Sequence, residues 1–107
     1  MKTRLALLLS LSLATAAHAS EDAAALWKAR CKNCHGEDGK ARTKTGRKES
    51  IVDMSQPAWQ KAQTDADIRE FIVDGSPRNK KMKPFKDKLT AEQIDSLVAY
   101  IRTLKAD

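Results

Sequence analysis

The sequence predicts an all-α protein with a single domain, and three observations support this prediction. Apolar residues recur at spacings of three and four in three separate segments, which is the pattern of helices with one buried face. No run of five or more residues alternates between apolar and polar side chains, as a half-buried strand would. The length of 107 residues leaves room for one domain.

The first predicted helix runs from Asp22 to about Asn33. Its alanine-rich start has high helix propensity. Residues at helical spacing between Ala23 and Cys34 share one side of this helix. Two acidic residues, Glu21 and Asp22, stand at its start, where the helix dipole favours negative charge.

Two further helices are predicted from capping boxes. Thr64 to Asp67 has the form of such a box, with a hydroxyl and an acid three residues apart, and it opens a helix that Gly75 ends after Asp74. Thr90 to Gln93 has the same form and opens the last helix, which runs to near the C-terminus. The apolar stripe of this last helix consists of Ile94, Leu97, Val98, Ile101 and Leu104.

The first 19 residues are organised like a secretory signal. A basic start precedes an apolar run of 13 residues from Leu5 to Ala17, and Ala17-His18-Ala19 has the small-x-small form of a cleavage site. The apolar run is shorter than the roughly 20 residues that span a bilayer. We therefore predict a cleaved signal peptide over 1–19, export to the periplasm, and a mature domain over 20–107. An uncleaved membrane anchor is the alternative.

The mature domain is poor in residues that build apolar cores. Only 14 of its 88 residues are Leu, Ile, Val or Phe, which is 16% and falls below the roughly 20% at which disorder becomes a realistic alternative. Chains this short often need a disulfide, a metal or another staple. The composition therefore excludes a multidomain enzyme and indicates a bound group around which the chain folds.

The strongest motif in the sequence is Cys31-Lys32-Asn33-Cys34-His35, because Cys-x-x-Cys-His is the attachment pattern for c-type haem. Two thiols three residues apart on a helical turn face the same way. They can form thioether bonds with the two vinyl groups of one haem. The following imidazole, that of His35, can then bind the iron. A covalently bound haem would also supply the missing apolar volume.

Three other uses of these cysteines compete with haem attachment. An exported chain with two cysteines permits a structural disulfide between Cys31 and Cys34. A redox dithiol normally lies in a strand-helix context that this sequence lacks. A zinc site needs about four ligands, and the mature domain offers two Cys and one His. The disulfide and the dithiol also leave His35 unexplained, so haem is the favoured interpretation.

A six-coordinate iron requires a second axial ligand, and a thioether sulfur is a soft donor that raises the reduction potential. The mature domain contains Met54 and Met82. Met82 is isolated among lysines in a loop that Pro84 stiffens, which makes it a poor core residue, whereas Met54 has a use as a filler of a thin core. We favour Met82, and a vacant sixth position stays open.

At this point the mature chain resembles a small class I cytochrome c over nearly its whole length. The shared features are Cys31 to His35 near the start, Met82-Lys83-Pro84-Phe85 after the middle helix, and the segment Leu89 to Ile94 that leads into the last helix. The resemblance implies an all-α class I fold in which three main helices surround one haem. It also implies that the first and last helices cross, packing through residues such as Trp27, Leu97, Tyr100 and Ile101. It implies Cys31 and Cys34 on the haem, with His35 and Met82 as ligands of its iron.

Trp59 extends this resemblance, whereas the segment after His35 departs from it. The indole N–H of Trp59 is a donor only, and in relatives this position contacts a haem propionate; a plain core aromatic is the alternative. Many members of the family have a proline about a dozen residues after the haem histidine, whose carbonyl accepts the His ring N–H. Residues 36–50 contain no proline. We expect a backbone carbonyl within 42–47 to replace it.

The charge of the chain suggests a docking face for redox proteins. The net charge of +6 falls to +4 when Lys2 and Arg4 leave with the signal, and basic residues concentrate in 36–49 and 76–88. Lysines beside a haem would steer the protein to an acidic partner. A solvated basic surface without a preferred partner is the alternative. Nucleic-acid binding is disfavoured, because no such motif is visible.

We therefore expect a monomeric periplasmic one-electron carrier with covalently bound haem c, rather than an enzyme. Neither a pair of carboxylates nor a nucleophile with its base stands out in the sequence. The enzyme-class alternative is a haem peroxidase or a gas-binding haem protein, which requires an open sixth position. The binding-class alternative is a thiol module without haem.

Overall fold

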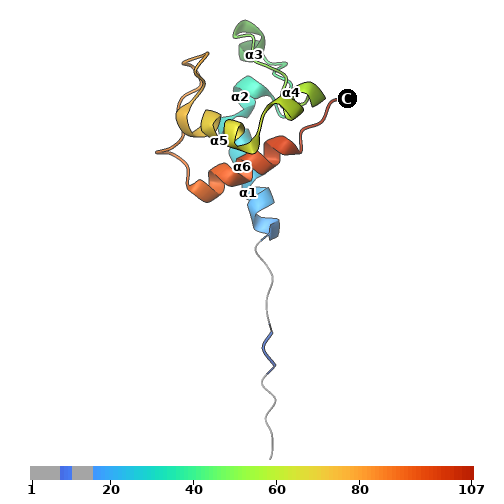
Figure 1. The fold of residues 1–107 in the computed structure, drawn as a ribbon, viewed down its shortest axis with the longest axis vertical. Helices are drawn as coiled ribbons and strands as arrows, with labels where there is room; N and C mark the ends of the chain where they lie inside the picture. Colours follow the sequence, from blue (N-terminus) through green and yellow to red (C-terminus); the bar gives the residue numbers. More distant parts are fainter. Residues whose placement is uncertain (1–7, 11–15) are drawn as a thin grey trace, which may run out of the picture.

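The computed structural model describes residues 8–10 and 16–107, and its regular structure in these residues is helical without strands. The prediction of an all-α fold is therefore confirmed. The described residues form six helices (Figure 1), which are α1 (Ala16–Arg30), α2 (Lys32–His35), α3 (Lys44–Lys48), α4 (Pro57–Ala62), α5 (Asp65–Asp74) and α6 (Ala91–Arg102).

The first and last long helices pack against each other, as the resemblance implied. Figure 1 shows α6 lying across α1. The rings of Trp27 on α1 and Tyr100 on α6 have centroids 5.3 Å apart. Trp27 and Leu97 are almost completely buried. The core joins these two helices to α5, and its buried members are Trp27, Met54, Ile68, Ile72, Leu89, Ile94, Leu97, Val98 and Ile101.

Both predicted capping boxes are present. The Thr64 hydroxyl accepts a hydrogen bond from the Asp67 N–H, and the Asp67 carboxylate accepts one from the Thr64 N–H. Thr90 and Gln93 make the same reciprocal pair at the start of α6. The predicted starts of α5 and α6 are thus confirmed, because each box satisfies backbone donors that the helix leaves free.

The first helix differs from its prediction at both ends. It begins at Ala16, six residues earlier than Asp22, and it ends at Arg30, where a turn at Cys31 separates it from α2. Alanine is the strongest helix former, so the alanine-rich segment continues the helix on the N-terminal side of the acidic pair. The predicted cleavage position after Ala19 therefore lies inside α1.

The two short helices α3 and α4 fall in segments for which no helix was predicted. Each is roughly one and a half turns long, with 5 residues in α3 and 6 in α4, too short for an apolar stripe to be recognised. Their starting signals are nevertheless readable. Thr43 caps α3 by accepting a hydrogen bond from the Gly46 N–H, and Pro57 occupies the first position of α4.

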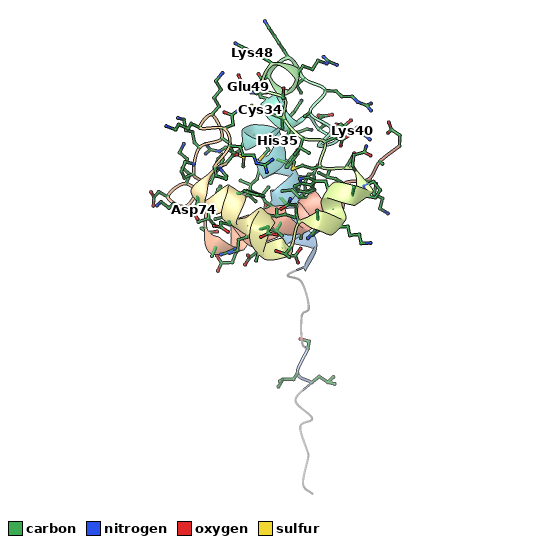
Figure 2. The ribbon with its side chains drawn as sticks, turned by 45° about the horizontal axis from the view of Figure 1, so that its top comes forward. Cys34, His35, Lys40, Lys48, Glu49 and Asp74 are labelled. Carbon is green, nitrogen blue, oxygen red and sulfur yellow. The ribbon has the colours of Figure 1, made fainter. Side chains whose placement is uncertain are left out.

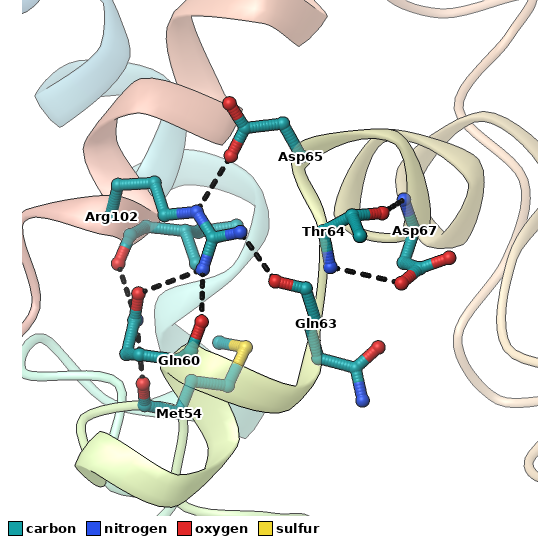
Figure 3. A network of polar contacts seen from close by, with 8 residues as sticks. Met54, Gln60, Gln63, Thr64, Asp65, Asp67 and Arg102 are labelled. Atoms are coloured by element: carbon teal, nitrogen blue, oxygen red, sulfur yellow. Dashed lines mark hydrogen bonds and ion pairs between the residues drawn. The ribbon is translucent and has the colours of Figure 1, made fainter.

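Arg102 ties the end of α6 to the junction of α4 and α5 (Figure 3). Its guanidinium donates to the Asp65 carboxylate at 2.6 Å, to the Gln60 carbonyl at 2.7 Å and to the Gln63 carbonyl. The Gln60 amide in turn donates to the carbonyls of Met54, at 2.8 Å, and of Ile101, at 2.9 Å. This network fixes α4 against the core although α4 itself is short.

The signal peptide prediction lies largely outside the described residues, because 1–7 and 11–15 are not among them. Cleavage after Ala19 stays a prediction. In the described part of the chain, no helix combines the length and apolar character needed to cross a membrane.

Candidate functional site

The junction of α1 and α2 brings the two cysteines and His35 onto adjoining turns. The Cys31 N–H donates to the Trp27 carbonyl at 2.9 Å, and the His35 N–H donates to the Cys31 carbonyl at the same distance. Cys34 lies between them, its N–H 3.3 Å from the Cys31 carbonyl. Both thiols are free, so the structure contains no disulfide here. Figure 2 shows Cys34 and His35 beside each other at this junction.

The thiol of Cys31 is half-buried at the α1–α2 junction, and this burial affects its pKa. Burial raises its pKa to about 11, with the neighbouring Cys34 adding to the increase and Arg30 opposing it. Redox and metal-binding cysteines depend on thiolates with lowered pKa values. The raised pKa of the half-buried Cys31 thiol is the reverse of this pattern.

Within the described residues, no metal-binding cluster accompanies the cysteines. Among residues 8–10 and 16–107, no group of three or more His, Cys, Asp and Glu side chains is placed to hold a metal ion. A zinc site built from about four protein ligands therefore has no ligand set in that part of the chain.

The imidazole of His35 lies against Trp27, with ring centroids 5.9 Å apart. Burial lowers the pKa of His35, which keeps the ring neutral in neutral solution. Neutral imidazole is the form that binds metals. The Nδ1 atom is buried and has no hydrogen-bond partner within the described residues. A buried polar atom without a hydrogen-bond partner costs folding free energy. Such an atom is expected where a residue interacts with a bound group.

The expected carbonyl partner for His35 within 42–47 is not found. In this segment the carbonyls of Thr43, Thr45, Gly46 and Arg47 accept N–H groups of the turns that form and follow α3. The contact to the motif instead runs through a side chain. The Thr43 hydroxyl donates to the Cys34 carbonyl at 2.7 Å and accepts from the Gly46 N–H at 2.8 Å.

Gly46 allows this close approach of α3 to the cysteine motif. A β-carbon at position 46 would lie 2.2 Å from the Ala41 oxygen and 2.9 Å from the Cys34 oxygen. Only glycine fits between these backbone atoms. Thr43 and Gly46 thus position the motif, and neither was singled out in the sequence, because their partners are defined by the fold.

Trp27 has a closer relation to the site than its predicted packing role. Its indole N–H donates to the Gly36 carbonyl at 2.8 Å, directly after the haem-type motif, while its ring contacts His35. Trp27 therefore connects the imidazole to the α1–α6 contact through Tyr100.

The two methionines of residues 20–107 occupy different environments. Met54 is buried in the core, and its N–H donates to the Gly39 carbonyl at 3.0 Å. This is the filler role that the sequence offered for it. Met82 is half-buried in the loop between α5 and α6, where its N–H donates to the Asn79 carbonyl at 3.1 Å. Met82 is thus the methionine of this pair that does not pack into the core.

Trp59 lies on α4, partly buried against the core. This placement agrees with a core aromatic, and a contact with a haem propionate stays a prediction.

The two basic stretches approach each other in part. Figure 1 shows α3 and the first part of the loop between α5 and α6 toward the end away from the start of α1, while the later part of that loop runs back to the start of α6; Figure 2 places Lys48 at the α3 end. The basic side chains exposed on these stretches are Arg42, Lys44, Arg47, Lys48, Arg78, Lys80, Lys81, Lys83, Lys86 and Lys88. Lys40 is different: it is buried, donates to the Ser55 hydroxyl at 3.2 Å and pairs with Asp107.

The comparisons with known proteins agree with this geometry. The family described as cytochrome c oxidase, cbb3-type, subunit III, matches residues 18–101. The chain belongs to this family of c-type cytochromes. Membership confirms the resemblance, the class I fold and the cofactor, which is covalently bound haem c with its iron.

Two solved structures resemble this cytochrome closely. One is titled KustC0563 c-type cytochrome; it is 36% identical, with a TM-score of 0.72, over 79% of this chain and 99% of that one. The other is a mutant of Kustc0563, 37% identical with a TM-score of 0.69, over 78% of this chain and 99% of that one. Among curated proteins, none matches this chain.

The residues at the α1–α2 junction fit haem c. The junction offers two free thiols on one turn and a neutral imidazole next to them. These are the attachment groups and the nitrogen ligand that haem c requires.

Proposed function

We propose that this cytochrome is a periplasmic one-electron carrier that moves electrons between respiratory redox proteins. The observation that carries the proposal is the pair of free thiols on one turn beside the half-buried, neutral His35. Haem c supplies an iron that can gain and lose one electron. The chain's own residues then hold the haem, set its potential and present it to partners.

In this proposal Cys31 and Cys34 would form the two thioethers, and His35 and Met82 would be the two protein ligands of the iron. The neutral imidazole of His35 is ready to bind without losing a proton. Met82 is the favoured second ligand because Met54 is committed to the core. A thioether ligand favours the reduced iron, so the reduction potential is expected to be positive. Trp59 is proposed as the donor to a haem propionate.

The basic surface supports a carrier that meets its partners by diffusion. Exposed lysines on both the α3 segment and the loop carrying Met82 give the proposed haem end a positive field. Such a field speeds the encounter with an acidic partner and weakens at higher salt. The proposed partners are redox proteins with an acidic docking face, and the proposed carrier works as a monomer.

A potentiometric titration of the holoprotein followed by its visible spectrum tests the proposal. We expect a single one-electron transition at positive potential, with a sulfur-to-iron charge-transfer band in the oxidised form. Met82→Ala should remove this band and open the sixth position to added cyanide, whereas Met54→Leu, the matched control, should keep it. A wild-type protein without the band that binds cyanide freely would favour the peroxidase or gas-binding alternative.

A further inference from the structure

Glu49, the residue that follows α3, joins two segments that are far apart in the sequence. Its Oε2 atom accepts a hydrogen bond from the Asn79 amide at 3.1 Å, and its Oε1 atom pairs with the Lys81 ammonium group. Both partners lie in the loop between α5 and α6, and Lys81 is the direct neighbour of Met82. The two oxygens of one carboxylate are thus both used to hold one loop.

Other hydrogen bonds of this loop are local or lead back to α5. The Ser76 N–H donates to the Met82 carbonyl at 3.3 Å, and the Phe85 N–H donates to the Ile72 carbonyl at 3.0 Å. In the described residues, the hydrogen bonds that connect the loop with the α3 segment are those of Glu49. The α3 segment is itself bonded to the cysteine motif through Thr43 and the Cys34 carbonyl. Glu49 therefore completes a chain of contacts from the motif to the loop of Met82.

The Glu49 carboxylate is more enclosed than its ion-pair partner. The Glu49 side chain is 17% exposed, whereas the Lys81 side chain is 64% exposed. Hydrogen bonds from Lys81 and Asn79 lower the pKa of Glu49, so the carboxylate is charged at neutral pH. Hydrogen bonds to charged groups are about twice as strong as neutral ones.

We propose that Glu49 is a positioning residue that holds the loop of Met82 in place, so that Met82 keeps its contact with the haem iron. The inference rests on the proposed function, in which Met82 is the second axial ligand. Without the carboxylate, the tip of the loop keeps its internal turn but loses its attachment to the α3 segment. The population in which Met82 is detached then rises, while the helices keep their packing.

Competition with imidazole measures this population directly. Imidazole added to the oxidised holoprotein binds where Met82 has left, so its apparent affinity is proportional to the detached fraction. We expect Glu49→Gln, which keeps the size and removes the charge, to strengthen apparent imidazole binding about tenfold, as loss of hydrogen bonds to a charged group implies. Lys81→Gln should change the affinity in the same direction by a smaller factor, because Asn79 still holds Glu49.

Asp95→Asn is the matched control, because it breaks an exposed ion pair away from this loop. It should leave imidazole binding unchanged. Unfolding by urea, followed by far-UV circular dichroism, should give the same midpoint for Glu49→Gln and Asp95→Asn, which separates positioning of Met82 from general stability. The double variant of Glu49 and Lys81 should bind imidazole no more tightly than Glu49→Gln alone.

Two results would overturn the inference in distinguishable ways. If the wild type shows the charge-transfer band but Glu49→Gln binds imidazole as weakly as Asp95→Asn does, the positioning role is wrong and the proposed ligation stands. If the wild type lacks the band, the proposed ligation by Met82 is wrong and the inference falls with it.

Discussion

Gly75 sets the start of the loop that carries Met82. Its φ of +79° lies in the region that favours glycine, and a β-carbon there would lie 2.6 Å from the Met82 carbonyl oxygen. The turn can therefore close only over a residue without a side chain. The same residue was expected from the sequence to end α5, and the structure adds its contact with the Met82 backbone.

We predict that Gly75→Ala destabilises the protein by about 1–3 kcal/mol, because both the backbone conformation and the contact with Met82 become strained. The displaced loop should also weaken the charge-transfer band of the oxidised protein. Urea unfolding and the visible spectrum check the two effects. Wild-type stability together with an unchanged band would show that the turn tolerates a β-carbon.

At the scale of elements, the capping box of α5 predicts a pH dependence. The hydrogen bond from the Thr64 N–H lowers the pKa of Asp67 below its ordinary value of 3.8. A carboxyl with a lowered pKa contributes stability that is fully present above the ordinary value and is lost as the pH falls through the folded value. We therefore expect Asp67→Ala to be less stable than wild type at neutral pH and to approach it in acid.

Urea unfolding followed by far-UV circular dichroism at several pH values measures this difference. Glu70→Ala, an exposed acidic residue on the same helix, is the control and should show no such trend. A difference between Asp67→Ala and wild type that stays constant down to the lowest pH would contradict the role of the ionised carboxylate.

The contacts of Arg102 hold the short helix α4 in place, and a substitution of Arg102 tests this role. The planar Arg102 guanidinium serves two carbonyls and one carboxylate at once, a geometry that an ammonium group cannot reproduce. We expect Arg102→Lys to cost about 1–2 kcal/mol of unfolding free energy, as loss of partly buried charged hydrogen bonds implies. Thermal or urea unfolding measures it. Arg69→Lys is the control, and equal losses in the two variants would argue against a special role of Arg102.

The helices also show which structural features can be predicted from sequence patterns. The helices α5 and α6 were predicted because capping boxes and apolar spacing are local signals. The short helices α3 and α4 offer no stripe, and the first helix was predicted too short because the alanine-rich residues before Asp22 also favour helix. The Cys31–His35 motif was readable because its members are neighbours. The role of Glu49 could not be predicted from the sequence, because its partners lie about 30 residues away and only the fold brings them together.

At the scale of the whole molecule, the exposed basic residues of 36–49 and 76–88 predict how reaction rates respond to salt. The reduced protein should react with an anionic oxidant such as hexacyanoferrate more slowly as ionic strength rises, because salt screens charges beyond about 10 Å at 0.1 M. A cationic oxidant of similar size, such as a cobalt tris-chelate, is the control and should react faster as salt rises. Stopped-flow mixing measures both. Equal salt responses for the two reagents would argue against steering by these basic residues.

The intact mass of the exported protein under denaturing conditions tests the central claim most directly, because only covalently attached haem survives unfolding. The account predicts the mass of the processed chain plus one haem for the wild type, and the bare chain for the variant in which Cys31 and Cys34 are both serine. A folded wild-type protein with the bare polypeptide mass would contradict the account.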